Sequence, residues 1–306
     1  MSYKILFMGT PNFAIPILKS IVNSKHKILE IYSQPPRKKN RGQKIKNSAV
    51  HDFAIKFNIP VRCPVRFEDN NEIEHIKKLN PDVVVVVAYG KILPKKLLDL
   101  KNLIFLNVHA SLLPRWRGAA PIQRAIMNMD KETGVSIMKI VPKLDAGPVL
   151  IQSKIVINKE INQEELSLKI STLGGKLIID ALELIKNNKA NFKLQDETKA
   201  SYANKIEKSE SKISWNDDAK KIIAKINALN PRPGCWFALS GLRIKILKAK
   251  EVKISGKPGE IINQNLTIGC FKNAIQILEL KKEGKKKMTT KEFLRGNKIK
   301  VGQSLN

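Results

Sequence analysis

The sequence predicts an α/β fold, in which a doubly wound N-terminal domain is followed by a small β-barrel domain. Apolar runs of strand length alternate with segments of helical periodicity over residues 4–108, an alternation typical of parallel sheets covered by helices. The run at 82–88 contains five consecutive valines, as expected of a central strand buried on both faces. Beyond residue 230 short apolar stretches are separated by glycine turns, which favours a small barrel.

The elements of the N-terminal part follow from the apolar periodicity, taken in chain order. Continuous apolar runs that end at turn residues predict buried strands at 4–8, 28–32, 61, 82–88 and 103–108. Apolar residues spaced three and four apart predict the intervening helices at 13–22, 48–57, 73–79 and 93–98. The segment 34–47 is polar, basic and contains proline and glycine, so we expect a loop there.

After residue 108 the same reasoning first extends the sheet and then changes the architecture. Helices are predicted at 122–128 and 164–186, and added strands at 133–141 and 149–157. A polar stretch precedes the C-terminal part and predicts a linker. A helix at 219–229 is followed by the short strands of the barrel, expected at 234–239, 242–250, 259–262, 266–270 and 274–280.

Positive charge is unevenly distributed along the chain. The 306 residues carry 56 Lys+Arg against 27 Asp+Glu, a formal net charge of +29. Residues 191–306 alone hold 25 basic and 11 acidic residues, a net charge of +14. A lysine-rich composition would account for many of these side chains, but the local basic clusters favour a polyanionic partner, most simply nucleic acid.

Apolar runs and cysteines define the expected environment of the protein. The longest apolar run, 83–88, is far shorter than the roughly 18 residues of a membrane span. The three cysteines are widely spaced and odd in number, which argues against a disulfide framework and against a zinc site. We therefore expect a cytoplasmic protein that binds no membrane and no metal.

Two polar side chains stand at the end of the strand predicted at 103–108. Asn107 and His109 are two residues apart, so an amide and an imidazole point to the same side of the strand. Ligands of open α/β sheets bind at the carboxyl ends of strands, where this pair lies. A strand-end asparagine and a histidine satisfied in the core would give the same pattern, so the pair alone leaves both interpretations open.

The surrounding motif favours the functional interpretation. Asn107-Val108-His109 continues into Ser111-Leu112-Leu113-Pro114, and Leu-Asp-Ala-Gly follows at 144–147. Together these segments resemble the folate-dependent formyltransferase family, and the segments 7–14, 86–94 and 195–198 are similar to those of its tRNA-dependent members. The resemblance covers nearly the full chain. It implies a Rossmann-like catalytic domain at 1–189, a linker at 190–205 and a basic OB-like domain for tRNA binding at 206–306.

This resemblance also implies a reaction and roles for three residues. A formyl group would move from 10-formyltetrahydrofolate, the co-substrate, to the α-amino group of methionine on initiator tRNA. Asn107 would donate an amide N–H to the oxyanion that forms, and His109 would donate to it or carry a proton. Asp145 would orient the imidazole or relay the proton. The resemblance implies a monomer, and we expect neither a metal nor a nucleotide cofactor.

Two binding regions are implied in the same way. Residues of the motif would line the folate pocket, and a strand-end tyrosine would pack on the pterin: Ser111, Leu112, Leu113, Pro114 and Tyr89. In the loop at 34–47, Arg41 would probe the first base pair of the tRNA acceptor stem. Contacts to phosphates would come from Arg37, Lys38, Lys39 and Lys44.

Three other functions compete with this interpretation. A glycinamide ribonucleotide or sugar N-formyltransferase would share Asn107, His109 and Asp145, but would not need the basic loop or the basic C-terminal segment. A non-catalytic RNA-binding protein would not need the intact catalytic set. An NAD-dependent dehydrogenase is disfavoured because Gly9-Thr10-Pro11 is not the Gly-x-Gly-x-x-Gly fingerprint.

Overall fold

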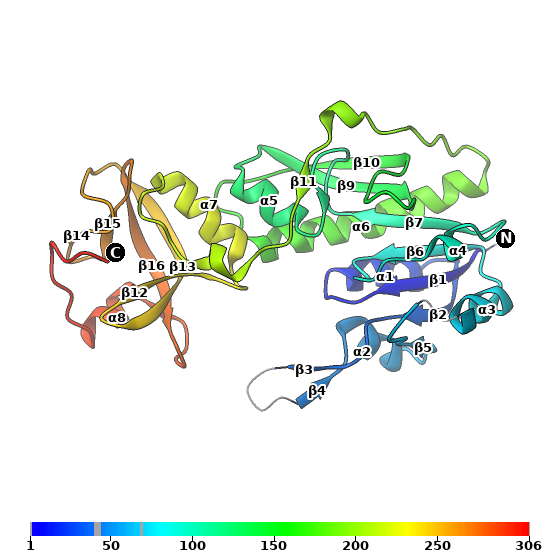
Figure 1. The fold of residues 1–306 in the computed structure, drawn as a ribbon, viewed down its shortest axis with the longest axis horizontal. Coiled ribbons are helices and arrows are strands. Elements are labelled where there is room, and N and C mark those ends of the chain that lie inside the picture. The colour runs from blue at the N-terminus through cyan, green and yellow to red at the C-terminus, as the bar shows by residue number, and fades with distance from the viewer. Residues whose placement is uncertain (1, 40–43, 68–69, 306) are drawn as a thin grey trace. The chain divides into compact units, whose positions relative to one another are not determined.

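The computed structural model describes residues 2–39, 44–67 and 70–305, and the chain folds as two compact units (Figure 1). The first unit contains Met1–Gly118, Thr133–Ile155 and Ser167–Tyr202, and the second contains Ala119–Glu132, Val156–Leu166 and Ala203–Asn306. Two stretches from the middle of the chain therefore belong with the C-terminal part. Of the helices in the described ranges, none is both long and apolar enough to cross a membrane.

A sheet of seven strands, counted among the described residues, forms the centre of the first unit in the order β10-β9-β7-β6-β1-β2-β5. The strands are β1 (Lys4–Gly9), β2 (Lys27–Tyr32), β5 (Val61–Arg62), β6 (Val83–Val87), β7 (Ile104–His109), β9 (Glu132–Lys139) and β10 (Val149–Val156). Five of them pair in parallel, and β9 runs antiparallel to β7. All five valines of β6 are buried. The α/β fold class is confirmed.

Helices cover this sheet and fix the position of β7. Those of the first unit are α1 (Ala14–Val22), α2 (Ala49–Lys56), α3 (Asn70–Leu79), α4 (Lys95–Leu98) and most of α6 (Gln163–Lys186). A Cβ at Gly175 would lie 2.4 Å from Oγ of Ser20 on α1, and one at Gly174 would lie 3.0 Å from Val108 of β7. Glycine therefore lets α6 approach both elements more closely than any other residue would.

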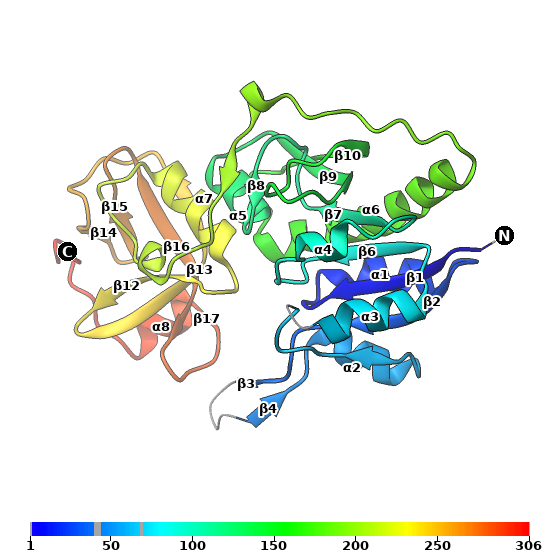
Figure 2. The same cartoon turned by 45° about the vertical axis from the view of Figure 1, so that its right-hand side comes forward.

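The predicted loop at 34–47 contains a short antiparallel hairpin, made of β3 (Arg37–Lys39) and β4 (Lys44–Lys46). Figure 2 shows the hairpin extending away from the sheet of the first unit. Pairing of the two strands satisfies backbone polar groups that an open loop would leave to water. The strands were not predicted because three residues are too few for an alternating pattern.

The second unit is built on a curled antiparallel sheet (Figure 1), in the order β12-β13-β16-β15-β14, with β17 paired to β16. Its strands are β12 (Cys235–Leu239), β13 (Leu242–Val252), β14 (Ile261–Asn263), β15 (Thr267–Gly269), β16 (Ala274–Lys282) and β17 (Met288–Thr289). The barrel-like sheet predicted for the C-terminal part is confirmed.

Three helices complete the second unit: α5 (Pro121–Met127), α7 (Ala219–Leu229) and α8 (Thr290–Arg295). The buried face of α7 joins a core that includes Trp215 and Phe237, whose rings meet edge-on at 5.7 Å. The α8 helix was not predicted from the sequence. It begins with a capping box, in which the Thr289 hydroxyl accepts the Glu292 N–H and the Glu292 carboxylate accepts the Thr289 N–H.

Candidate active site

The carboxyl end of β7 carries the first two predicted catalytic residues, and the loop after β9 carries the third. Asn107 lies in register with Val86 of β6, and His109 with Ser136 of β9. The Asn107 Nδ2 is 3.4 Å from Asp145 Oδ1, and the His109 Nδ1 is 3.6 Å from Asp145 Oδ2. The structure therefore brings together three side chains, of which Asp145 had been linked to the other two only by the resemblance.

The two ring nitrogens of the buried His109 have different surroundings. The Nε2 lies 2.9 Å from the backbone carbonyl oxygen of Trp116. A carbonyl can only accept, so we assign a proton to Nε2 as the donor of this hydrogen bond. The Nδ1 faces the carboxylate of Asp145. It is therefore the nitrogen that can take up and release a proton beside a carboxylate.

Asp145 is held in a closely defined conformation. Its backbone φ is +45°, in the left-handed region, and its Oδ2 accepts the backbone N–H of Gly118 at 2.8 Å. Two residues further on, a Cβ at Gly147 would lie only 1.8 Å from the carbonyl oxygen of Lys139 on β9. Only glycine fits there, so the loop that carries Asp145 can lie directly against β9.

The predicted folate-binding segment, 111–114, is a loop bonded to Ser136 of β9. Ser111 and Leu113 are buried, whereas Leu112 and Pro114 are partly exposed. The Ser136 hydroxyl donates to the Ser111 carbonyl at 2.6 Å and accepts the Leu113 N–H at 3.1 Å. The partly exposed pair is therefore the one that can contact a ligand, while the buried pair holds the loop in place.

Tyr89 directly follows the end of β6 and Ala88. Its ring is 1 % exposed, meets Phe67 edge-on at 6.2 Å, and its hydroxyl has no hydrogen-bond partner within the described ranges. Burial raises the pKa of this phenol. The Tyr89 carbonyl accepts from Thr10 and from the Gln34 amide, and the same amide donates to the Gly90 carbonyl at 2.9 Å.

The predicted tRNA-binding residues lie on or beside the β3–β4 hairpin. Arg37, Lys38 and Lys44 are exposed on its strands, and Lys39 is the last residue of β3. The Arg37 guanidinium donates to the Gln34 side chain at 2.8 Å, which links the hairpin to the carbonyls at the end of β6. Arg41 lies outside the described residues.

Sequence reasoning missed a polar network around Asp145. Arg117, whose side chain is fully buried, donates to both carboxylate oxygens of Glu197 at 2.9 and 3.0 Å and to Gln195 Oε1 at 2.9 Å. Hydrogen bonds from Arg117 and then Lys143 lower the pKa of Glu197 from its usual 4.5 to about 2. The motif at 195–198 was a signal for this network, but no role was assigned to it.

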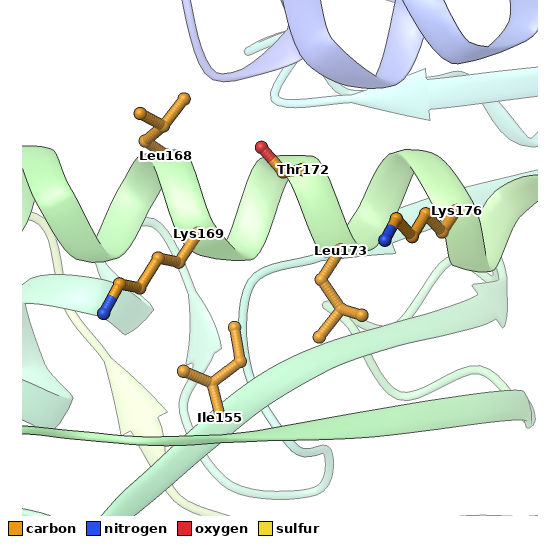
Figure 3. A pocket seen from close by; sticks show the side chains of 6 residues that line it. All are labelled: Ile155, Leu168, Lys169, Thr172, Leu173 and Lys176. Carbon is orange, nitrogen blue, oxygen red and sulfur yellow. The ribbon is translucent and has the colours of Figure 1, made fainter.

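A shallow pocket of about 380 Å³ lies on another part of the first unit, between α6 and β10 (Figure 3). It is lined by Ile155, Leu168, Lys169, Thr172, Leu173 and Lys176. None of the predicted site residues lines it. Across the described ranges, no three His, Cys, Asp or Glu side chains gather as a metal site would require.

The class of the protein follows from two family models, which together match most of the chain and make it a formyl transferase. The family model described as formyl transferase matches residues 3–182, and that of the formyl transferase C-terminal domain matches residues 205–298. The methionyl-tRNA formyltransferase of Pelagibacter ubique (strain HTCC1062) is 49% identical over 100% of this chain and 99% of that protein. The methionyl-tRNA formyltransferase of Parvibaculum lavamentivorans (strain DS-1) is 42% identical over 99% of both chains. The chain belongs to the methionyl-tRNA formyltransferase family, which confirms the resemblance inferred from the sequence.

Solved structures share the fold. An N-formyltransferase from Helicobacter canadensis, in complex with folinic acid and dTDP-3-aminofucose, aligns with a TM-score of 0.69 over 90% of this chain and 99% of that chain, at 20% identity. HypX from Aquifex aeolicus, in complex with tetrahydrofolic acid, aligns with a TM-score of 0.64 at 17% identity. That alignment covers 99% of this chain and about half (51%) of the HypX chain.

Proposed function

We propose that this protein transfers the formyl group of 10-formyltetrahydrofolate to the α-amino group of methionine on initiator tRNA. The observation that carries the proposal is the convergence of Asn107, His109 and Asp145 in a chain that is 49% identical, end to end, to a methionyl-tRNA formyltransferase. In acyl transfer to an amine, an amide donor can stabilise the oxyanion, and an imidazole beside a carboxylate can move the proton.

Asn107 stabilises the negative charge that develops on the formyl oxygen. A side-chain amide has two N–H groups. One of them points to Asp145 over a long distance of 3.4 Å, which leaves the other for the substrate. Since donors of this kind are fixed before the reaction begins, they cost no reorganisation when charge appears, and removal of one lowers the rate by on the order of 10²–10³.

His109 and Asp145 handle the proton. As the methionine nitrogen bonds to the formyl carbon, it must lose a proton, and the folate nitrogen must gain one as its bond to that carbon breaks. The Nδ1 of His109 accepts the proton from the first nitrogen and returns it to the second, so the protein ends as it began. The carboxylate of Asp145, 3.6 Å from Nδ1, balances the charge on the ring between the two steps.

Two basic surfaces would hold the tRNA. The first is the β3–β4 hairpin with Arg37, Lys38, Lys39 and Lys44, together with Arg41, which would read the acceptor end. The second is the sheet of the C-terminal segment, 206–306, which we propose as the basic tRNA-binding domain beyond a linker at 190–205. In this proposal the protein acts as a cytoplasmic monomer.

On the C-terminal sheet, basic side chains lie close together, and such a cluster favours binding of a polyanion. Lys245 of β13 lies directly opposite Lys281 of β16, and like charges in such a pair repel. Partial burial and the neighbouring Arg243 and Lys281 lower the pKa of Lys245. The Arg243 guanidinium lies 3.8 Å above the ring of Trp236. Bound phosphates would neutralise these charges and release counterions.

The experiment is a transfer assay with labelled 10-formyltetrahydrofolate and three acceptors: initiator methionyl-tRNA, glycinamide ribonucleotide and a nucleotide-linked amino sugar. We expect turnover with the tRNA alone. The His109→Ala variant serves as the control for uncatalysed transfer. Faster transfer to either small acceptor than to the tRNA would overturn the proposal in favour of another formyltransferase. No transfer to any acceptor would leave a binding protein with a formyltransferase fold.

A further inference from the structure

A second set of residues controls the geometry of the catalytic set without being part of it. It centres on the strap, defined here as residues 195–201, which contains the 3-10 helix η1 (Glu197–Lys199). The Gln195 Nε2 donates to the carbonyl oxygens of Asp145 at 2.8 Å and Gly147 at 2.7 Å. Gln195 thus bonds the backbone of the residue whose carboxylate faces His109.

The oxygen of the same amide is also fixed. The Gln195 Oε1 accepts from Arg117 Nε at 3.1 Å and Nη2 at 2.9 Å. A glutamine amide offers two N–H groups and two lone pairs, so these four bonds use its whole capacity and leave one orientation. Arg117 is fixed in turn by Glu197 of the strap. Glu197 also binds Lys143, which lies two residues before Asp145.

Backbone strain on both sides of the site depends on the strap. Trp116 and Asp145 are not glycines, yet their φ angles are +60° and +45°. Residues in this conformation cost free energy and persist only where the surroundings over-determine them. The Trp116 N–H donates to the Ser201 hydroxyl at 3.0 Å, the Arg117 N–H donates to the Ser201 carbonyl at 2.8 Å, and Gln195 bonds the Asp145 carbonyl.

These two strained residues are the ones that orient His109. The carbonyl of Trp116 accepts from its Nε2, and the carboxylate of Asp145 faces its Nδ1. We propose that Gln195, supported by Arg117 and Glu197, is a positioning residue that sets the Asp145 carboxylate against His109. The inference rests on the proposed function and names residues of that site beyond the Asn–His–Asp set.

If Gln195 only held the loop together, its loss would unfold the loop, whereas a positioning role predicts a slower reaction in a folded protein. The loop that carries Asp145 is also anchored to β9, where the Lys139 N–H donates to the Pro148 carbonyl at 3.0 Å. Loss of the Gln195 amide should therefore let the peptide of Asp145 rotate without unfolding the loop. A misplacement of about 1 Å costs on the order of 10²-fold in rate, so loss of the Gln195 amide should lower kcat. Folate and tRNA binding should stay unchanged.

The test compares Gln195→Glu and Gln195→Met with wild type in steady-state and single-turnover formylation. Glu keeps an acceptor for Arg117 but has no N–H for the two carbonyls. Met has a side chain of similar length but can neither accept from Arg117 nor donate to the carbonyls. We expect kcat to fall by on the order of 10²-fold in both variants, with both KM values close to wild type, and we expect the Glu variant, which keeps the acceptor for Arg117, to melt close to wild type. Asp196→Asn is the matched control, because in the described part of the chain that carboxylate bonds Thr198 and Lys199 of the strap itself.

A second readout does not depend on activity. The chain has four histidines, so ¹⁵N spectra of histidine-labelled protein resolve the ring nitrogens of His109, assigned with a His109→Gln variant. Both Gln195 variants should shift these signals, and Asp196→Asn should not. If the Gln195 variants fail to fold, Glu197→Gln, at a half-exposed carboxylate, provides the same two readouts.

Wild-type kcat or wild-type His109 signals in a folded Gln195 variant would overturn the positioning role, and so would a loss confined to KM. These outcomes differ from failure of the proposed function. If wild type transferred no formyl group to tRNA, the enzyme assignment would fall, and the spectra would still decide whether Gln195 sets the geometry of His109.

Discussion

The backbone N–H of Gly118 donates to the Asp145 carboxylate at 2.8 Å. Gly118 lies two residues beyond Trp116, whose carbonyl holds the Nε2 of His109. One short stretch of chain therefore fixes both partners of the proposed proton-transfer pair, although Asp145 is 27 positions from Gly118 in sequence. Fixed hydrogen bonds of this kind keep the relative orientation of an acid and a base constant through the reaction.

Asp145→Asn should retain the fold and lose activity. The new amide oxygen can still accept from Gly118, but its NH₂ group then faces the Asn107 NH₂, and nothing balances charge on His109. We expect kcat to fall by roughly 10²–10⁴-fold, measured in single turnover, with a melting temperature within a few degrees of wild type. An unchanged rate would reduce Asp145 to a turn residue.

His109→Ala and Asn107→Ala should each remove most turnover while tRNA binding stays largely intact. The reason is that in the proposed function both side chains act on the reacting atoms, whereas the proposed phosphate contacts lie on the β3–β4 hairpin and the C-terminal sheet. The expected loss for Asn107→Ala is on the order of 10²–10³ in kcat. Filter binding of tRNA to each variant provides the control. Near wild-type kcat at saturating substrates would contradict the chemical role of the residue concerned.

Glu197→Gln should lower stability in a pH-dependent manner. The folded-state pKa of Glu197 is depressed from 4.5 to about 2, first by Arg117 and then by Lys143. Its contribution is therefore complete above about pH 4.5 and is lost as pH falls toward 2. Urea unfolding of wild type and variant at a series of pH values should show a constant difference in the free energy of unfolding above about pH 4.5, and this difference should narrow as pH falls from 4.5 toward 2. A difference independent of pH would contradict the ion pair.

Binding of tRNA should be steeply salt-dependent, with a contribution from the C-terminal sheet. Replacing Lys245 and Lys281 together by Gln should reduce the slope of log affinity against log salt by roughly 1 for each phosphate that is no longer neutralised. The matched control replaces Lys169 and Lys176, two exposed lysines on α6, by Gln. Equal slopes for the two double variants would mean that the sheet lysines reflect composition and not a binding surface.

Arg41→Ala should slow formylation of initiator methionyl-tRNA more than Lys38→Ala or Lys39→Ala does. An arginine can enter an acceptor end whose terminal bases are unpaired, because opening a paired end costs a few kcal/mol. Lysine contacts to phosphates would position the stem without reading it. We expect a loss of kcat/KM of roughly tenfold or more for Arg41→Ala and a narrower preference over elongator methionyl-tRNA. Equal losses in all three variants would place discrimination elsewhere.

Local patterns in the sequence were sufficient to predict the fold. The valine run at 83–87 predicted β6, and the pattern at 219–229 predicted α7 with the bounds that the structure has. The first is a continuous apolar run, typical of a strand buried on both faces, and the second has a strong helical period that marks its buried face. The convergence of Asn107 and His109 could also be predicted, since residues two apart at a strand end share one side.

Features that depend on tertiary pairing could not be predicted. The hairpin strands of three residues carry no period, and α8 spans only six residues, although Thr289 and Glu292 have capping-box spacing. The bond between Arg117 and Gln195 joins positions 78 apart. Nothing in the local sequence shows that a buried arginine will meet a glutamine so far along the chain, so the support of Asp145 emerged only from the structure.

The burial of Arg117 has a consequence for how this chain can evolve. Its guanidinium has no access to water and is satisfied by Gln195 and Glu197. A change at either partner leaves a buried cation short of an acceptor, and a change at Arg117 leaves the glutamine amide without orientation. Single mutational steps away from this arrangement therefore pass through a poorer enzyme. Across a set of related sequences, positions 117, 195 and 197 should be inherited as one unit, and replaced together where they are replaced at all.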